Sequence, residues 1–301
     1  MPKKIDLVGN ASDWIRYSDY QIKETSTGEV YILPSEGARF NMYNPFNVAE
    51  DLIIDLIDIG DIALQFEKDN DEETKSKLYN DILIFAKKYG LLGLISASTY
   101  NRNIIGDEVV LLVDNNPIST DKIIDEKSYL DHFIPFTDEG DIVINHYKNS
   151  VDVVKREDSP KYHGKRPVVL DLVFSKFYSE QIDWVIDFAK MISSHFNQLL
   201  IYKNSNSYLT ENVTIMAGKF QAHKMGFTIE QLDKTTISWQ FDSLKTAIET
   251  IYAFAVTDES TLIDRCSHCK SVFIANNSRK KYCDTSCRNR ANVQKSRQRN
   301  K

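Results

Sequence analysis

The segment Cys266–Arg290 reads CSHCKSVFIANNSRKKYCDTSCRNR and contains all four cysteines of a 301-residue chain. Two residues separate Cys266 from Cys269, and three separate Cys283 from Cys287, which is typical of paired ligands on one metal ion. A chain of this length with every cysteine in one short segment is not building a disulfide framework. Four thiolates at about 2.3 Å fill a tetrahedral shell, so the sequence predicts one structural Zn²⁺ per chain.

The residues between the ligand pairs predict a knuckle, a hairpin and a helix, which is a treble-clef-like arrangement. Asn276–Ser278 favours a turn between the strand-forming segments Val272–Ile274 and Lys281–Tyr282. So small a unit cannot bury enough apolar surface to fold alone, so metal binding should stabilise it. The alternatives to zinc are an iron–sulfur cluster or free thiols. His268 could replace a cysteine as ligand, but we expect it to be a solvent-facing knuckle residue.

A helix is predicted from the second ligand pair to the C-terminus. Cys283 and Cys287 are four residues apart and would lie on one face of its first turn, capped by Asp284 or Thr285. After Cys287, the helix would present a row of asparagine and serine side chains on the side opposite the zinc, with a row of basic side chains on each side of it. Such a surface suits the major groove of DNA. The predicted nucleic-acid contacts are Arg279, Lys280, Lys281, Arg288, Asn289, Arg290, Asn292, Lys295, Arg297 and Arg299.

Charge is distributed unevenly along the chain. From Arg265 onward there are eleven basic residues and one acid, Asp284, so this tail carries +10 and the rest of the chain −16. The asymmetry predicts a polyanionic partner for the tail alone, most simply duplex DNA. An acidic helical face, which we expect to be solvated, could alternatively cover the basic tail in an off state. Its residues are Glu50, Asp51, Asp55 and Asp58.

The cysteine spacing, followed by Asn289-Arg290 and a basic C-terminal helix, resembles the CGNR zinc-finger family of bacterial proteins. The resemblance implies that the four cysteines are zinc ligands and that Asn289-Arg290 are the N-R of the family signature. It also implies a finger at the C-terminus of a larger domain, in a transcriptional regulator. Arg288 stands where the family has glycine, and Tyr89–Gly93 looks like a stretch seen upstream in such proteins.

Residues 1–262 are predicted to form a mixed α+β body, and residues 263–301 the finger. Helical periodicity runs from Val48 to Phe66, over 71–89 before Gly90, and from Ile182 to Leu200. Residues 148–167 are polar and break-rich, which indicates a long loop or an internal boundary. Strands are expected at Glu29–Leu33, Val109–Val113 and Val168–Phe174, a hairpin at 227–241, and a helix capped by Asp242 at 244–255.

The body has no P-loop, no G-x-G-x-x-G after a strand, no H-E-x-x-H and no G-x-S-x-G. His195 is expected to be a packed residue and not a catalytic base. We therefore expect a non-enzymatic DNA-binding regulator whose body senses a signal, with a small-molecule effector or a homodimer as further expectations. The alternatives are an RNA-binding, translation-linked factor and an enzyme targeted by its finger. Without a signal peptide or membrane span, the chain is expected in the cytoplasm, on the nucleoid when bound to DNA.

Overall fold

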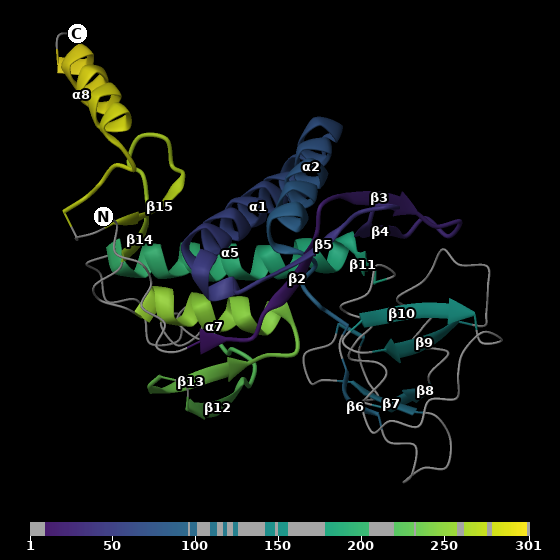
Figure 1. The fold of residues 1–301 in the computed structure, drawn as a ribbon. Coiled ribbons are helices and arrows are strands. Elements are labelled where there is room, and N and C mark those ends of the chain that lie inside the picture. The colour runs from purple at the N-terminus through teal and green to yellow at the C-terminus, as the bar shows by residue number, and fades with distance from the viewer. Residues whose placement is uncertain are drawn as a thin grey trace.

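The computed structural model describes twelve segments of the chain, and structural statements below concern these alone. They are residues 10–95, 97–100, 109–112, 117–118, 123–125, 142–147, 150–155, 178–204, 220–231, 233–257, 262–275 and 279–299. The fold is mixed helix and sheet, as predicted: helices form its centre, and several small sheets surround them (Figure 1).

Helix α1 is the centre of the body and packs against α5, α2 and α7. The predicted periodicity is confirmed, because Leu52, Leu56, Ile59 and Ala63 are all buried. Together with the 3₁₀ helix η1 (Pro45–Val48), the helices are α1 (Ala49–Asp69), α2 (Glu72–Tyr89), α5 (Ile182–Asn204), α7 (Leu244–Thr257) and α8 (Thr285–Arg299).

Close approach of α1 and α5 depends on one glycine. A Cβ at Gly60 would lie 2.2 Å from the carbonyl oxygen of Ala189 and 2.6 Å from Cβ of Ser193. Only a residue without a side chain lets the two backbones lie so near each other. The crossing therefore fixes the neighbouring residue Asp61 against α5, which matters for the site described below.

The helix ends follow local chemistry. The Asp71 carboxylate accepts a hydrogen bond from the Thr74 N–H at 2.8 Å and caps α2, and Gly90 ends that helix with a φ of 84°. For α7 the predicted cap is wrong by one residue. The hydroxyl of Ser243, not the carboxylate of Asp242, accepts from the Thr246 N–H at 3.1 Å.

The strands form small sheets of two or three members. Their orders are β1-β13-β12, β11-β4-β3, β6-β7-β8, β2-β5, β9-β10 and β14-β15, and among the described strands only the β1–β13 pair is parallel. The N-terminal strands are β1 (Asn10–Ala11), β2 (Trp14–Tyr17), β3 (Tyr20–Glu24), β4 (Val30–Pro34) and β5 (Phe40–Tyr43). The central strands are β6 (Ala97–Tyr100), β7 (Val109–Leu112), β8 (Ile123–Asp125), β9 (Ile142–Tyr147) and β10 (Ser150–Lys155). The remaining strands are β11 (Glu180–Gln181), β12 (Gly226–Gln231), β13 (Thr235–Gln240), β14 (Leu262–Arg265) and β15 (Val272–Ala275).

Most predicted strands are confirmed, including β4, β7 and the β12–β13 hairpin. The loop predicted at 148–167 is wrong over residues 150–155, which form β10 and pair antiparallel with β9. The alternation of valine with polar residues in Ser150–Lys155 outweighs the polar composition around it. The strand predicted at Val168–Phe174 lies outside the described residues. None of the helices that the structure describes is long and apolar enough to cross a membrane.

Candidate metal centre and nucleic-acid surface

Four sulfur atoms meet at the C-terminal end of the molecule. The Sγ atoms of Cys266, Cys269, Cys283 and Cys287 all lie within 4.8 Å of one another. Cys266 and Cys287 are buried, Cys283 is half-buried and Cys269 is exposed. The sequence prediction that these four residues come together is confirmed, and they could hold a metal ion.

The spacing of the sulfurs fits a tetrahedral thiolate site. The Sγ atoms of Cys269 and Cys283 are 3.7 Å apart. A disulfide requires about 2.05 Å, whereas four sulfurs at about 2.3 Å from a central zinc are about 3.8 Å from one another. Four soft thiolates around one tetrahedral ion would leave no position for water or substrate, which is the arrangement of a structural site.

Local geometry prepares one of the thiols for a metal. Burial raises the pKa of Cys266, but the backbone N–H groups of Cys269, Cys283 and His268 donate to its sulfur and lower that pKa to about 6. Burial and the adjacent sulfurs raise the pKa of Cys283. Close thiolates repel one another, and a bound cation would remove that repulsion because metal ligands are deprotonated.

The knuckle is the tip of a hairpin that the sequence did not predict. Strand β15 pairs with β14, which precedes the first cysteine, and not with Lys281–Tyr282 as expected. Within the turn, the Cys266 N–H donates to the Ser271 carbonyl and the Lys270 N–H to the Cys266 carbonyl, both at 2.9 Å. Lys270 has a φ of 66°, a left-handed conformation uncommon for a lysine. The predicted hairpin was wrong because β15 pairs with β14, which places Ile263 and Val272 in the core of the body, and Lys281–Tyr282 does not form a strand.

The second ligand pair spans a helix start. Cys283 lies before α8, and only Cys287 is helical, so the prediction of both on one helical turn is wrong. The reason is the cap: the Asp284 carboxylate accepts from the Cys287 N–H at 2.7 Å. Of the two predicted caps, Asp284 is therefore the one used.

The β14–β15 hairpin belongs to two hydrophobic cores. Ile263 and Val272 are buried in the large core of the body. Phe273 and Ala275, on the other face of β15, form a small core with Cys266 and Cys287. The finger is therefore built directly onto the body, and the division at residues 262 and 263 stays a prediction.

Arg265, the residue before the first ligand, joins the knuckle to helices α1 and α5. Its Nη1 and Nη2 lie 2.7 and 2.9 Å from the two carboxylate oxygens of Asp61. Its Nε donates to the Asn197 side chain at 3.0 Å, and Nη1 also donates to the Lys270 carbonyl at 3.2 Å. Asp61 accepts further bonds from Ser193 and Asn197. One guanidinium thus links the metal knuckle to both central helices.

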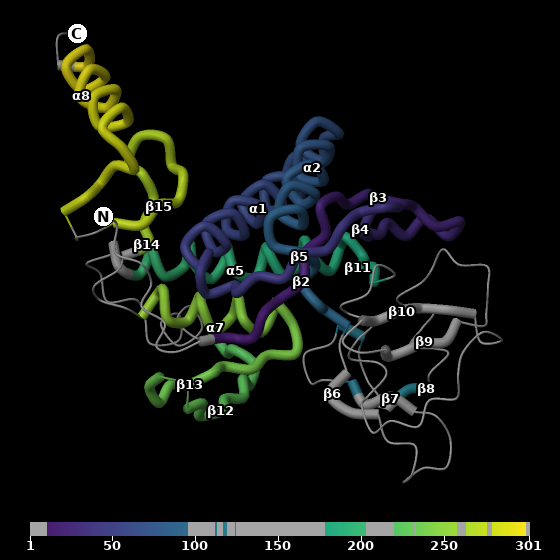
Figure 2. Tube along the Cα trace, viewed as in Figure 1, coloured from purple at the N-terminus to yellow at the C-terminus, as the bar shows by residue number. Residues whose placement is uncertain are grey.

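Helix α8 leads away from the hairpin and from the rest of the body (Figure 2). Ala291, four residues after Cys287, is buried on the finger side. Of the residues predicted to contact nucleic acid, those described as exposed on this helix are Arg288, Asn289, Arg290, Asn292, Lys295 and Arg297, and Arg299 is the last helical residue.

The three basic residues before α8 differ in their surroundings. Arg279 and Lys281 are exposed. Lys280 is half-buried, with its Nζ 5.2 Å from the centre of the Phe273 ring. The Lys281 carbonyl accepts from the Ser267 N–H at 2.9 Å, which ties this segment to the knuckle. Lys280 therefore packs on the finger core, while the other two side chains are open to solvent.

Glu180 is a buried carboxylate that sequence reasoning missed. It accepts from the Leu92 N–H at 3.0 Å, from the Leu94 N–H at 2.9 Å and from the Tyr178 hydroxyl. Burial raises its pKa. It organises the Tyr89–Gly93 stretch, whose neighbour Trp14 donates from Nε1 to the Leu91 carbonyl at 2.9 Å.

His195 and His223 of the body make side-chain contacts within the fold. His195 has its Nδ1 2.6 Å from the Tyr252 hydroxyl, and burial lowers its pKa. The buried Glu249 carboxylate contacts two side chains. One oxygen lies 2.7 Å from Nδ1 of His223, and the other accepts a hydrogen bond from Nζ of Lys245 at 2.7 Å. Asp58, on the predicted acidic face, is half-buried, and burial together with nearby carboxylates raises its pKa to about 6.

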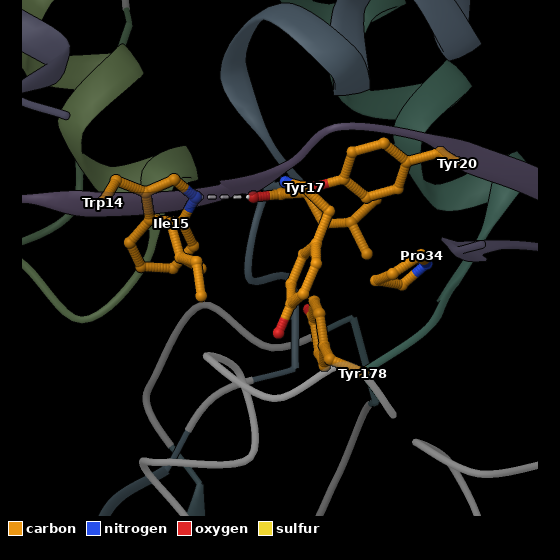
Figure 3. A pocket seen from close by; sticks show the side chains of 7 residues that line it. Trp14, Ile15, Tyr17, Tyr20, Pro34 and Tyr178 are labelled. Atoms are coloured by element: carbon orange, nitrogen blue, oxygen red, sulfur yellow. Dashed lines mark hydrogen bonds between the residues drawn. The ribbon is translucent and has the colours of Figure 1, made fainter. Parts of the chain in front are cut away.

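An apolar pocket lies between the N-terminal strands and Tyr178 (Figure 3). Its lining residues are Trp14, Ile15, Tyr17, Tyr20, Pro34, Leu91 and Tyr178. The space that it leaves holds about one water molecule. It has no room for an organic effector of the usual size.

Comparison with known proteins gives no relative: no family model, curated protein or solved structure matches this chain.

Proposed function

We propose that this protein is a DNA-binding transcriptional regulator whose C-terminal finger holds one structural zinc ion. The observation that carries the proposal is α8. It begins at the cysteine cluster, extends away from the body and contains five basic residues with no acid between Thr285 and Arg299. Such a helix, anchored at one end by a metal, is a suitable size and charge for a major groove.

The arrangement supports separate roles along α8. Asn289 and Arg288 follow Cys287 directly, where the metal would hold the helix rigid, and their amide and guanidinium groups can pair with base edges. The Asn289 side chain is exposed and has no hydrogen bond within the described residues, so it is free to contact a base. Arg297 and Arg299 lie near the open end and suit phosphate contacts, which carry no sequence information. The resemblance of the cysteine spacing and Asn289-Arg290 to the CGNR signature supports the same function.

The proposed role of the metal is to hold the finger together. Elemental analysis of the purified chain should give one zinc per molecule, and Cys283→Ser should lose it. A zinc content near zero in the unaltered chain would contradict a zinc site. Because Ile263 and Val272 belong to the core of the body, chelation should release α8 while the hairpin keeps its place on the body.

The nucleic-acid partner is tested by comparing duplex DNA, single-stranded DNA and structured RNA at one salt concentration. We expect the zinc-loaded chain to bind duplex DNA most tightly and to lose that affinity on chelation. Tighter binding to RNA would replace DNA by RNA as the partner. Binding that survives chelation would place the interface outside the finger.

A further inference from the structure

The β12–β13 hairpin presents an apolar face to solvent. Phe227 and Ile229 on β12 are 60% and 70% exposed. Their register partners on β13 are Trp239 and Ile237, and directly opposite residues of an antiparallel pair share a face. The rings of Phe227 and Trp239 have centroids 5.9 Å apart. Single exposed apolar side chains are ordinary, but adjacent ones on one face mark a contact surface.

Strand β12 is also an edge. In the described sheet, of order β1-β13-β12, it has a partner on one side only. Its sequence, GFTIEQ, contains no proline or lysine and a single charge, Glu230. Edge strands of natural proteins are usually protected by such residues or by bulges. This edge therefore offers main-chain pairing next to an apolar face.

We propose that β12 pairs antiparallel with β12 of a second copy of this chain, about a two-fold axis at Thr228. Opposite residues must share a face, so a two-fold axis perpendicular to the sheet passes through a residue position. With the axis at Thr228, Phe227 of each copy lies opposite Ile229 of the other, and Glu230 of each copy lies opposite Gly226 of the other. An axis at Glu230 would bring two carboxylates together, and an axis at Ile229 would place Phe227 against Gln231.

A second copy would pair with the free backbone groups of β12 and form a closed dimer. Two-fold contacts use the same patch on both subunits, and pairing two edges leaves neither free for further growth. The two apolar faces become one, running from Trp239 and Phe227 to Ile229 and Ile237 of the second copy. Figure 1 shows the hairpin beyond α7 and well away from α8, so self-association does not depend on nucleic-acid binding.

The test is sedimentation of the full zinc-loaded chain without nucleic acid over about 1 to 300 µM. We expect a concentration-dependent dimer. Ile229→Lys should weaken association by at least about tenfold, because a lysine ammonium would face Phe227 of the second copy. The matched control is Phe40→Lys, at a side chain 66% exposed on β5, which should leave the dimer unchanged. A monomer at the highest concentration, or an unaffected Ile229→Lys dimer, would overturn the proposal.

The register has its own test. A residue on the two-fold axis faces its own copy, with Cβ atoms about 5 Å apart, close to what a disulfide needs. Under a mild oxidant Thr228→Cys should therefore form a cross-linked dimer through position 228, identified by peptide mass. Glu230→Cys is the control, since position 230 faces Gly226 of the second copy. Faster cross-linking of Glu230→Cys would contradict the axis at Thr228.

Discussion

Replacing Arg265 with alanine tests whether one guanidinium holds the finger on the body. The Arg265 side chain contacts Asp61 with two nitrogens, Asn197 with a third, and the Lys270 carbonyl of the knuckle. The side chains of Arg265 and Asp61 are only 21% and 29% exposed. A bidentate pair in such a setting is stronger than an exposed ion pair, whose value is usually below about 1 kcal/mol.

Two losses follow from the alanine. Asp61 keeps its bonds from Ser193 and Asn197 but loses its counter-charge in a partly buried position, which should cost about 2–4 kcal/mol of unfolding free energy. The Lys270 carbonyl, next to Cys269 of the cysteine cluster, loses a donor. Loss of such an outer-sphere partner lowers metal affinity by about 10- to 100-fold.

Urea unfolding and competition with a zinc chelator measure the two effects. In a double-mutant cycle, Arg265→Ala and Asp61→Ala should show a coupling of about 1–3 kcal/mol. Arg39→Ala removes an exposed guanidinium elsewhere on the body and is the control for lost charge. Additive losses in the cycle, or a zinc affinity of Arg265→Ala equal to that of Arg39→Ala, would refute the link.

Four further substitutions test the fold and α8. Gly60→Ala should lower the unfolding free energy by about 1–3 kcal/mol, because its Cβ would lie 2.2 Å from the Ala189 carbonyl oxygen; an unchanged thermal melt would mean that α1 and α5 are not in such close contact. The pKa of Asp58 is raised in the fold to about 6 from 3.8, so the folded state binds the extra proton and stability rises as pH falls between those values. Asp58→Asn should therefore raise the melting temperature at pH 7 relative to the unaltered chain, with the gain disappearing toward pH 4; a gain equal at both pH values would contradict this. In DNA binding, Asn289→Ala should cost about 1–3 kcal/mol on a preferred site and little on random duplexes, whereas Arg297→Ala should weaken both about equally; equal losses from Asn289→Ala on both would show that it does not read sequence.

The sequence predicts well what depends on local periodicity. Helices α1 and α2 and the β12–β13 hairpin were found because their apolar residues repeat at 3.6 or at 2 residues. The cysteine cluster was found because metal ligands come in pairs with a fixed spacing. Asp71 and Gly90 mark the ends of α2 by chemistry that involves only their neighbours.

The contacts that hold the elements together have no such local signal. Arg265 and Asp61 lie 204 residues apart in the sequence, and the residues around each give no indication that the two side chains meet. Glu180 bonds to backbone N–H groups of Leu92 and Leu94, a preference invisible in side-chain composition. The partner of β15 has no local signal either: the apolar run predicts a strand, but the choice between the two flanking segments depends on the packing of Ile263 and Val272 against the body.

The salt dependence of duplex binding by a matched pair of triple variants tests the central claim most directly. One variant neutralises Lys295, Arg297 and Arg299 on α8, and the other neutralises three exposed body lysines, all by substitution with glutamine. The body positions are Lys68, Lys77 and Lys234. For the unaltered chain, about five phosphate contacts predict a slope of log K against log salt near −4.5, or about 500-fold weaker binding at 200 than at 50 mM. The α8 variant should lose about 2.7 of that slope, at about 0.9 per phosphate contact, while the body variant keeps it. Equal slopes for the two variants would contradict nucleic-acid binding through α8.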